Sequence, residues 1–240
     1  MAIDYGMAIE PRLDIVGAAL ADPSRSRILC ELMDGRAFTN KELACAAGIT
    51  PQTTTAHLKQ LEQAGLTSSV RSGRHVYHRI RNEDVASTLE CLSLLSPTDH
   101  LNRAGNSQKD TRLARSCYNH IAGQLGVMMT KALAERDILN IQNDTVTRGS
   151  EYEAFLTDLG LRGMISESDK PVAKLCLDWT ERRHHISGPF AIALMQKCLD
   201  TGWLVRRTGS RALIITPSGY NAFERWFDLS PEDVYPVKTG

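Results

Sequence analysis

The feature that most constrains this fold is a pair of capped helices separated by a tight turn. Residues 39–42 read Thr-Asn-Lys-Glu, which fits a capping box in which the threonine hydroxyl and the glutamate carboxylate each accept a backbone amide proton. Gly48 ends this first helix. Thr50 and Pro51 begin a second helix, predicted over residues 51–64, because threonine is a good N-cap and proline suits a first helical turn. A short helix, a tight turn and a longer helix form the helix-turn-helix arrangement, whose second helix enters the major groove of DNA.

The flanking segments extend this pair into a winged domain. Apolar residues at helical spacing predict helices over residues 12–21 and 23–33 before the pair, and over residues 83–95 after it. Residues 66–80 are strand-like on both sides of an arginine-bearing turn at 71–74, which predicts a β-hairpin. A hairpin directly after the second helix is a wing, whose arginines are placed for phosphates or the minor groove.

Polar side chains on the second helix and basic side chains on the hairpin suit contact with double-stranded DNA. Glutamine can pair with adenine, and threonine can reach bases or phosphates. Residues 51–81 hold five basic side chains against one acidic side chain, in a chain whose net charge is zero, so the excess of positive charge is local. We expect the DNA contacts to come from Gln52, Thr53, Thr54, Thr55, His57, Lys59, Arg71, Arg74 and His75.

Residues 18–95 resemble the ArsR family of winged-helix repressors. The resemblance lies in residues 21–29, in residues 50–66 and in the Arg-x-Gly-Arg-x-Val-x-x-Arg-Ile pattern of residues 71–80. It implies a homodimer, formed through the first and last helices of this domain, that represses transcription from a palindromic operator. The family is known for metal sensing, but residues 39–43 hold no cysteine at the place of its paired-cysteine box.

The family's other metal site, on the last helix, is also incomplete in this sequence. That site needs paired Asp and His ligands, whereas Asp84 is followed by Val85 and Ala86, and His100 lies beyond Pro97. We therefore expect that neither familiar metal site of the family is intact.

The C-terminal half is predicted to be a second domain built from two degenerate winged-helix-like repeats. His-Ile-Ala-Gly at residues 120–123 matches His-Ile-Ser-Gly at residues 185–188, and the apolar positions that follow keep the same spacing. The helix predicted from Pro189 to Leu199 is mostly apolar, so we expect it to be buried rather than laid in a DNA groove. The predicted fold is thus mainly α with small β-hairpin wings. Its predicted parts are a winged helix-turn-helix domain at 1–95, a linker at 96–110 and a C-terminal sensor domain at 111–240, with repeats at about 111–160 and 176–230.

Each predicted repeat begins with a cysteine, an aromatic residue and a histidine, which makes the interface between the repeats a candidate sensor site. The candidate residues are Cys117, Tyr118, His120, Cys176, Asp178, Trp179, Arg182 and His185. Three functions stay open: a metal site of Cys117, His120, Cys176 and His185; a thiol sensor activated by nearby arginine; and a small-molecule pocket. The competing interpretation is that these side chains are buried and only structural.

The expected function is a cytoplasmic DNA-binding regulator rather than an enzyme. The sequence lacks a glycine-rich phosphate loop, a GxSxG elbow and an HExxH motif, and it specifies no cofactor. Its six cysteines include no CxxC pair, its N-terminus does not resemble a secretory signal, and no apolar run is long enough for a membrane helix. Two alternatives stay open: an enzyme that uses Cys117 or Cys176, and a winged-helix protein-interaction module without DNA binding.

Overall fold

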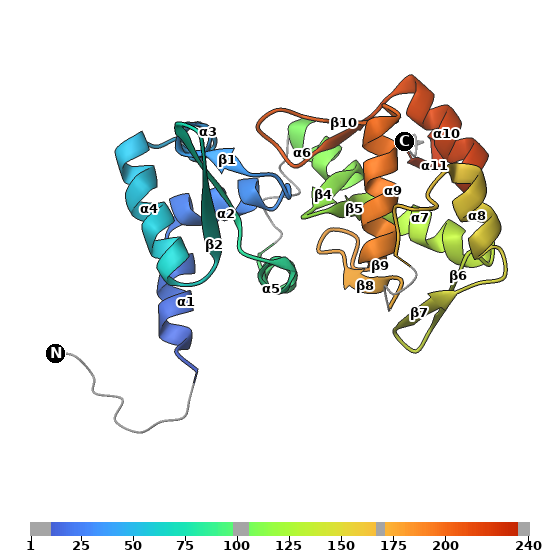
Figure 1. The fold of residues 1–240 in the computed structure, drawn as a ribbon, viewed down its shortest axis with the longest axis horizontal. Coiled ribbons are helices and arrows are strands. Elements are labelled where there is room, and N and C mark those ends of the chain that lie inside the picture. The colour runs from blue at the N-terminus through green and yellow to red at the C-terminus, as the bar shows by residue number, and fades with distance from the viewer. Residues whose placement is uncertain (1–10, 98–105, 167–170, 235–240) are drawn as a thin grey trace. The chain divides into compact units, whose positions relative to one another are not determined.

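The computed structural model describes residues 11–97, 106–166 and 171–234. They form two compact units, shown as a ribbon in Figure 1. The first unit holds the described residues up to Leu32 together with Ala37–Asn82. The second holds Met33–Arg36 and the described residues from Glu83 onward.

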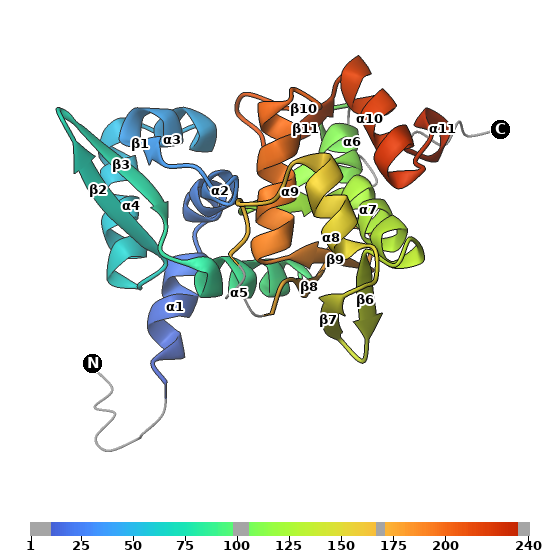
Figure 2. The same ribbon diagram turned by 45° about the vertical axis from the view of Figure 1, so that its right-hand side comes forward.

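The first unit is a winged helix-turn-helix. Its elements are α1 (Leu13–Leu20), α2 (Pro23–Leu32), β1 (Phe38–Thr39), α3 (Asn40–Ala47), α4 (Pro51–Gln63), β2 (Thr67–Ser72) and β3 (His75–Ile80). The three strands form one antiparallel sheet in the order β1-β3-β2. Figure 2 shows the long β2–β3 hairpin beside α4, which is the arrangement predicted for the wing.

Local signals account for the helix ends in this unit. Thr39 and Glu42 form the predicted capping box, and the Thr50 hydroxyl accepts a hydrogen bond from the amide of Thr53. Gly48 ends α3 at a φ of 68°, a left-handed conformation that glycine adopts without steric strain. The apolar faces of the helices then pack on the sheet in a core of fully buried residues, which includes Ile28, Leu32, Leu43, Leu61 and Ile80.

The second unit repeats one order of elements twice after two leading helices, α5 (Glu83–Ser93) and α6 (Asn106–Leu113). The first set is β4 (Arg115–Cys117), β5 (His120–Ala122), α7 (Gly123–Glu135), β6 (Leu139–Gln142), β7 (Thr145–Arg148) and α8 (Tyr152–Leu159). The second set is β8 (Lys174–Leu177), β9 (His184–Ser187), α9 (Pro189–Asp200), β10 (Leu204–Arg206), β11 (Leu213–Ile215) and α10 (Pro217–Phe227), followed by α11 (Pro231–Val234). Each set reads hairpin, helix, hairpin, helix. That the two sets are degenerate winged-helix-like repeats stays a prediction.

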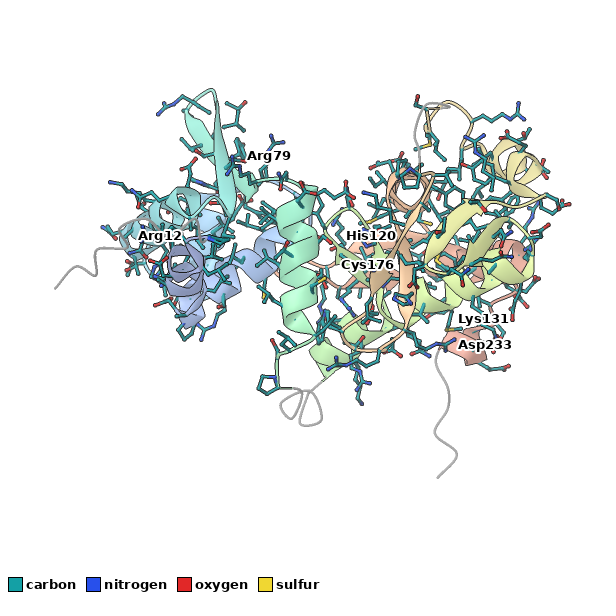
Figure 3. The ribbon with its side chains drawn as sticks, turned by 90° about the horizontal axis from the view of Figure 1, so that it is seen from below. Arg12, Arg79, His120, Lys131, Cys176 and Asp233 are labelled. Carbon is teal, nitrogen blue, oxygen red and sulfur yellow. The ribbon has the colours of Figure 1, made fainter. Side chains whose placement is uncertain are left out.

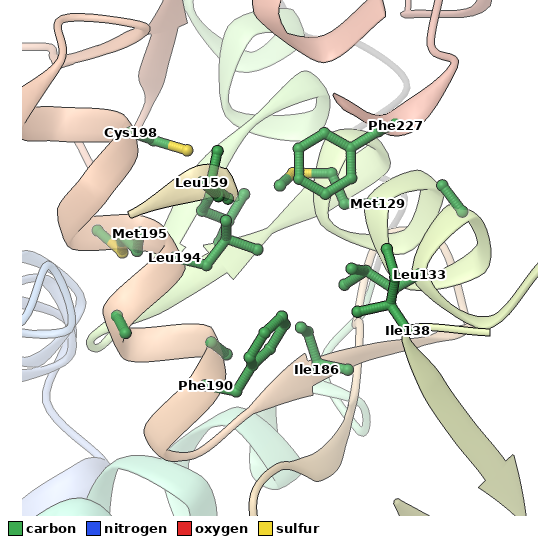
Figure 4. Close-up of a cluster of buried hydrophobic side chains, with 14 of the residues drawn as sticks. Met129, Leu133, Ile138, Leu159, Ile186, Phe190, Leu194, Met195, Cys198 and Phe227 are labelled. Carbon is green, nitrogen blue, oxygen red and sulfur yellow. The ribbon is translucent and has the colours of Figure 1, made fainter. Parts of the chain in front are cut away.

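One hydrophobic core joins both sets of elements. Figure 4 shows Met129 and Leu133 of α7 in the same cluster as Phe190 and Leu194 of α9. Because neither half can bury these side chains alone, the two halves form one domain. The prediction that the helix from Pro189 is buried is confirmed, because six of the twelve residues of α9 are buried.

The compact units differ from the predicted boundaries at two places. The predicted last helix of the first domain, α5, groups with the second unit, where the carboxylate of its buried Glu90 accepts a 2.6 Å hydrogen bond from Arg211. The predicted linker ran to residue 110, but α6 begins at Asn106, and residues 98–105 lie outside the described part of the chain. In the described ranges, no helix has both the length and the apolar character needed to cross a bilayer.

Candidate functional site

The outer surface of α4 and the wing carry most of the side chains that we expected to contact DNA. Seven of the nine are exposed: Gln52, Thr53, Thr55, Lys59, Arg71, Arg74 and His75. Arg79 is also exposed on β3 (Figure 3). Arg79 belongs to the basic segment at residues 51–81 but was not among the predicted DNA contacts.

Two residues of α4 are not where the sequence prediction put them. Thr54 was predicted on the outer face, but it is fully buried, and its hydroxyl donates to the backbone oxygen of Thr50 over 2.9 Å. His57 is half-buried, with its ring 3.7 Å from the carboxylate of Asp22 and 3.3 Å from the guanidinium of Arg25. Thr54 is therefore part of the core of the first unit, and His57 ties α4 to the start of α2.

The second unit brings two cysteines and two histidines into one cluster. Cys117 and His120 are directly opposite each other across the β4–β5 ladder, and Cys176 and His185 are directly opposite across the β8–β9 ladder. One sulfur or nitrogen atom from each of the four residues lies within 4.8 Å of the others. Figure 3 labels His120 and Cys176, one from each hairpin. We refer to these four residues as the Cys-His cluster.

The Cys-His cluster is compact and shielded from solvent. The two sulfur atoms are 4.0 Å apart, and the Nε2 atoms of the two histidines are 3.1 Å apart. Cys117, His120 and His185 are buried, and Cys176 is half-buried. The set combines two thiols with two imidazoles, which are ligands that zinc and related ions prefer.

The contact between the two thiol groups shifts their pKa values in opposite directions. The hydrogen bond from the Cys117 thiol lowers the pKa of Cys176 to about 2, and hydrogen bonds from His120 and His185 act in the same direction against burial. The pKa of Cys117 is raised well above its ordinary value, because this thiol donates that hydrogen bond and is buried. Burial also lowers the pKa of His120, which favours the neutral imidazole that can bind a metal.

A buried ion pair lies under His185. The guanidinium of Arg115 donates to the carboxylate of Asp178 over 2.9 Å, and both side chains are fully buried. Burial would raise the pKa of Asp178, but Arg115, the hydroxyl of Thr180 and the amide of Gly123 together hold it below its ordinary value. The Nδ1 atom of His185 lies 3.5 Å from the same carboxylate and has no hydrogen-bond partner among the described residues. Sequence reasoning did not identify Arg115, because its partner is 63 residues away in the chain.

The other predicted sensor residues are spread around this centre. Tyr118 is in the β4–β5 turn at a φ of 58°, and its amide donates to the backbone oxygen of Met33. The guanidinium carbon of Arg115 lies over the ring of Trp179, 4.6 Å from the centre of that ring. Arg182 is exposed and donates to the backbone oxygen of Leu94. The structure therefore brings the two cysteines and two histidines together, whereas the Arg182 side chain bonds to Leu94 instead.

A pocket of about 110 Å³ opens beside the Cys-His cluster. Cys117, His120 and Cys176 form part of its wall, and α5 contributes Glu83 and Glu90. Glu90 is buried, and its Oε2 atom has no hydrogen-bond partner among the described residues.

Comparison with known proteins gives one match over nearly the whole chain and others over shorter parts. Residues 22–69 match the bacterial regulatory proteins of the arsR family. An uncharacterized HTH-type transcriptional regulator of Bacillus subtilis, YdfF, is 38% identical over 224 residues, which covers 92% of this chain and 99% of that protein. The HTH-type transcriptional regulator CmtR of Mycobacterium tuberculosis is 36% identical over 80 residues, covering 33% of this chain and 67% of that protein.

Two solved structures match part of this chain. One is the homodimeric winged helix-turn-helix DNA-binding domain of Mb0332 from Mycobacterium bovis, which is 32% identical, covers 39% of this chain and 93% of that chain, and has a TM-score of 0.34. The other is the cadmium metal sensor CmtR of Mycobacterium tuberculosis, which is 35% identical, covers 33% of this chain and 81% of that chain, and has a TM-score of 0.29.

Proposed function

Because this chain belongs to the HTH-type transcriptional regulators and carries an ArsR-family domain over residues 22–69, we propose that it is a cytoplasmic homodimeric repressor that reads its operator with α4 and the wing. Like its relatives, it is a DNA-binding regulator and not an enzyme. The observation that supports the mode of reading is the row of exposed polar and basic side chains along α4 and the β2–β3 hairpin.

Each part of this surface has a distinct task in the proposed complex. Gln52 and Thr53 lie at the N-terminal end of α4, the end that contacts base edges in helix-turn-helix complexes. Lys59, Arg71 and Arg74 are exposed cations that suit phosphate oxygens, which position the protein without reading the sequence. Thr54 and His57 hold α4 in place, because Thr54 is buried in the core and His57 contacts Asp22 at the start of α2.

Exposed apolar residues support the homodimer. On α1, Leu13 is 72% exposed and Ile15 is 43% exposed. At the end of α5, Leu92 is 40% exposed and Leu95, just beyond the helix, is 81% exposed. Large apolar side chains left in water at two helices favour a partner surface. Light scattering is expected to give twice the chain mass, and the Leu13→Glu variant is expected to shift it toward a monomer.

Replacing Arg71 and Arg74 with alanine is expected to weaken operator binding and make it less sensitive to salt. The slope of log K against log salt becomes shallower by about 0.9 for each phosphate that the protein no longer neutralises. The measurement is fluorescence anisotropy over a salt series, with DNA selected by the purified protein from a random library. Arg183→Ala, an exposed arginine of the second unit, is the matched control.

Variants of α4 in the same experiment test whether this helix reads the operator. Lys59→Ala and Gln52→Ala should each reduce affinity, because both side chains are exposed on α4 and neither is in the core. If all of these folded variants bound DNA as the unaltered chain does, α4 and the wing would not be the reading surface.

A further inference from the structure

We infer that Cys117, His120, Cys176 and His185 bind one divalent cation of the zinc class in tetrahedral geometry, and that this cation changes the affinity of the protein for its operator. The cation site is independent of the DNA-reading surface. Only its regulatory effect rests on the proposed function.

The distances within the Cys-His cluster agree with such an ion. A tetrahedral zinc ion, with bonds of about 2.3 Å to sulfur and about 2.0–2.1 Å to nitrogen, holds two sulfurs about 3.8 Å apart and two nitrogens about 3.3 Å apart. The corresponding distances are 4.0 Å between the sulfurs and 3.1 Å between the Nε2 atoms. The remaining pairs of ligand atoms are also within 4.8 Å of each other, so side-chain shifts can bring all four atoms to one central ion.

The orientation of the histidines favours a cation over a purely structural network. Both Nε2 atoms point inward, 3.1 Å from each other, so without a cation they can bond to each other in one direction only or donate to the Cys176 sulfur. A cation accepts both lone pairs and places the ring protons on the two Nδ1 atoms. Those atoms face oxygens, at 3.3 Å from Asn119 Oδ1 and at 3.5 Å from Asp178 Oδ2. A carboxylate or amide behind a metal-bound histidine fixes its tautomer and ring orientation.

The charges also favour a divalent ion. The positive charge of Arg115 is matched by Asp178, so two thiolates at this place would need a charge of +2. Binding then transfers one ion into the cluster and releases to solvent any protons that the ligand thiols carry, because thiols bind metals as thiolates. The wall of the pocket beside the cluster holds Glu83 and Asp84 of α5 together with Lys174, and Arg211 pairs with Glu90, so a small excess of negative charge favours entry of a cation.

The ligand types select the class of metal. Thiolate and imidazole are soft and borderline ligands that suit Zn²⁺ and other thiophilic ions, whereas Mg²⁺ and Ca²⁺ require oxygen. A disulfide between Cys117 and Cys176 would join the two sulfurs but would not involve the two histidines, whose Nε2 atoms face each other. The cluster lies outside the residues matched to the ArsR family, because that match ends at Ser69, well before Cys117.

The β4–β5 hairpin provides a route from the ion to the DNA-reading unit. Next to Cys117, the hydroxyl of Ser116 donates to the carboxylate of Asp34 over 2.7 Å. The amide of Tyr118 donates to the backbone oxygen of Met33 over 2.8 Å. Met33 directly follows α2, so a shift of the hairpin acts on the chain where it leaves the helix that supports α4.

A second route runs through α5. This helix supplies part of the pocket wall beside the Cys-His cluster, and only Arg81 and Asn82 separate it from β3 of the wing. A cation held at the cluster therefore acts on segments that are covalently continuous with both α2 and the wing.

Titration of the reduced, metal-free full-length protein with Co²⁺ tests the site. We expect one ion per chain, an intense visible absorption of tetrahedral cobalt with a thiolate charge-transfer band, and loss of both when Zn²⁺ is added. Cys117→Ser, Cys176→Ser and His185→Gln should each weaken binding by at least about tenfold, the loss that disturbance of a metal site produces.

Matched controls separate ligand loss from misfolding. His184→Gln and Cys91→Ser change an exposed neighbour of His185 and an exposed cysteine, and both should bind Co²⁺ as the unaltered chain does. His120→Cys should keep the ion with a stronger charge-transfer band, because Cys₃His is also a zinc site. No cobalt spectrum in the unaltered chain, or equal binding by the ligand variants, would overturn the cation site.

Operator affinity with and without Zn²⁺ tests the regulatory effect. Coupling between two sites usually changes affinity by about 5- to 150-fold. We expect a change in this range in the unaltered chain and in His184→Gln, and none in Cys176→Ser. An unchanged affinity in a chain that binds one ion would overturn the regulatory effect alone. A chain that binds the ion but no selected DNA under either condition would instead contradict the proposed function.

Discussion

Asp178→Asn is expected to lower the free energy of unfolding of the second unit by about 3–5 kcal/mol, which is the usual effect of leaving one charge of a buried pair without its partner. Asp178 and Arg115 are both fully buried and 2.9 Å apart. The substitution leaves the guanidinium charged in a place that water does not reach. It also weakens the carboxylate's hydrogen bonds with the Gly123 amide and the Thr180 hydroxyl.

Tryptophan fluorescence during urea unfolding measures this effect selectively. All three tryptophans, Trp179, Trp203 and Trp226, belong to the second unit. Glu135→Gln is the control, because its pair with Lys131 is exposed and such pairs contribute at most about 1 kcal/mol. Equal small losses in both variants would mean that the buried pair is not a main support of this unit.

A second large effect is expected from Gly35→Ala, in the segment that joins α2 to β1. Gly35 has a φ of 81°, and a Cβ atom there would lie 1.9 Å from the backbone oxygen of Tyr118. A left-handed alanine costs about 1–2 kcal/mol, and the clash with a backbone atom adds about 1–3 kcal/mol. We therefore expect the free energy of unfolding to fall by about 2–5 kcal/mol.

Gly202→Ala isolates the conformational part of that loss. Gly202 has a φ of 69° in the same unit, but a Cβ atom there would meet no other atom within 4 Å. Its expected loss is about 1–2 kcal/mol, from the backbone conformation alone. If Gly35→Ala unfolded at the same urea concentration as Gly202→Ala, Met33–Arg36 would not be held closely against the β4–β5 turn.

The first unit was largely predictable because its signals are local. The capping box at Thr39 and the N-cap at Thr50 depend on residues three positions apart. The error at Thr54 shows the limit of this reasoning. Neighbouring residues on a helix point about 100° apart, so threonines in a row cannot all share an outer face. Only the packing of α4 decides that Thr54 is buried while Thr53 and Thr55 are exposed.

The sequence by itself determined that α3 and α4 form a capped pair followed by a basic hairpin, since each signal lies within one element. It also identified Cys117, His120, Cys176 and His185 as candidates, through the similar starts of two segments. Only the tertiary structure decided that these four converge, because the packing of two hairpins distant in the chain sets the distance between Cys117 and Cys176. Burial of Arg115 beneath them was decided in the same way, since a buried charge is stable only where folding brings its partner.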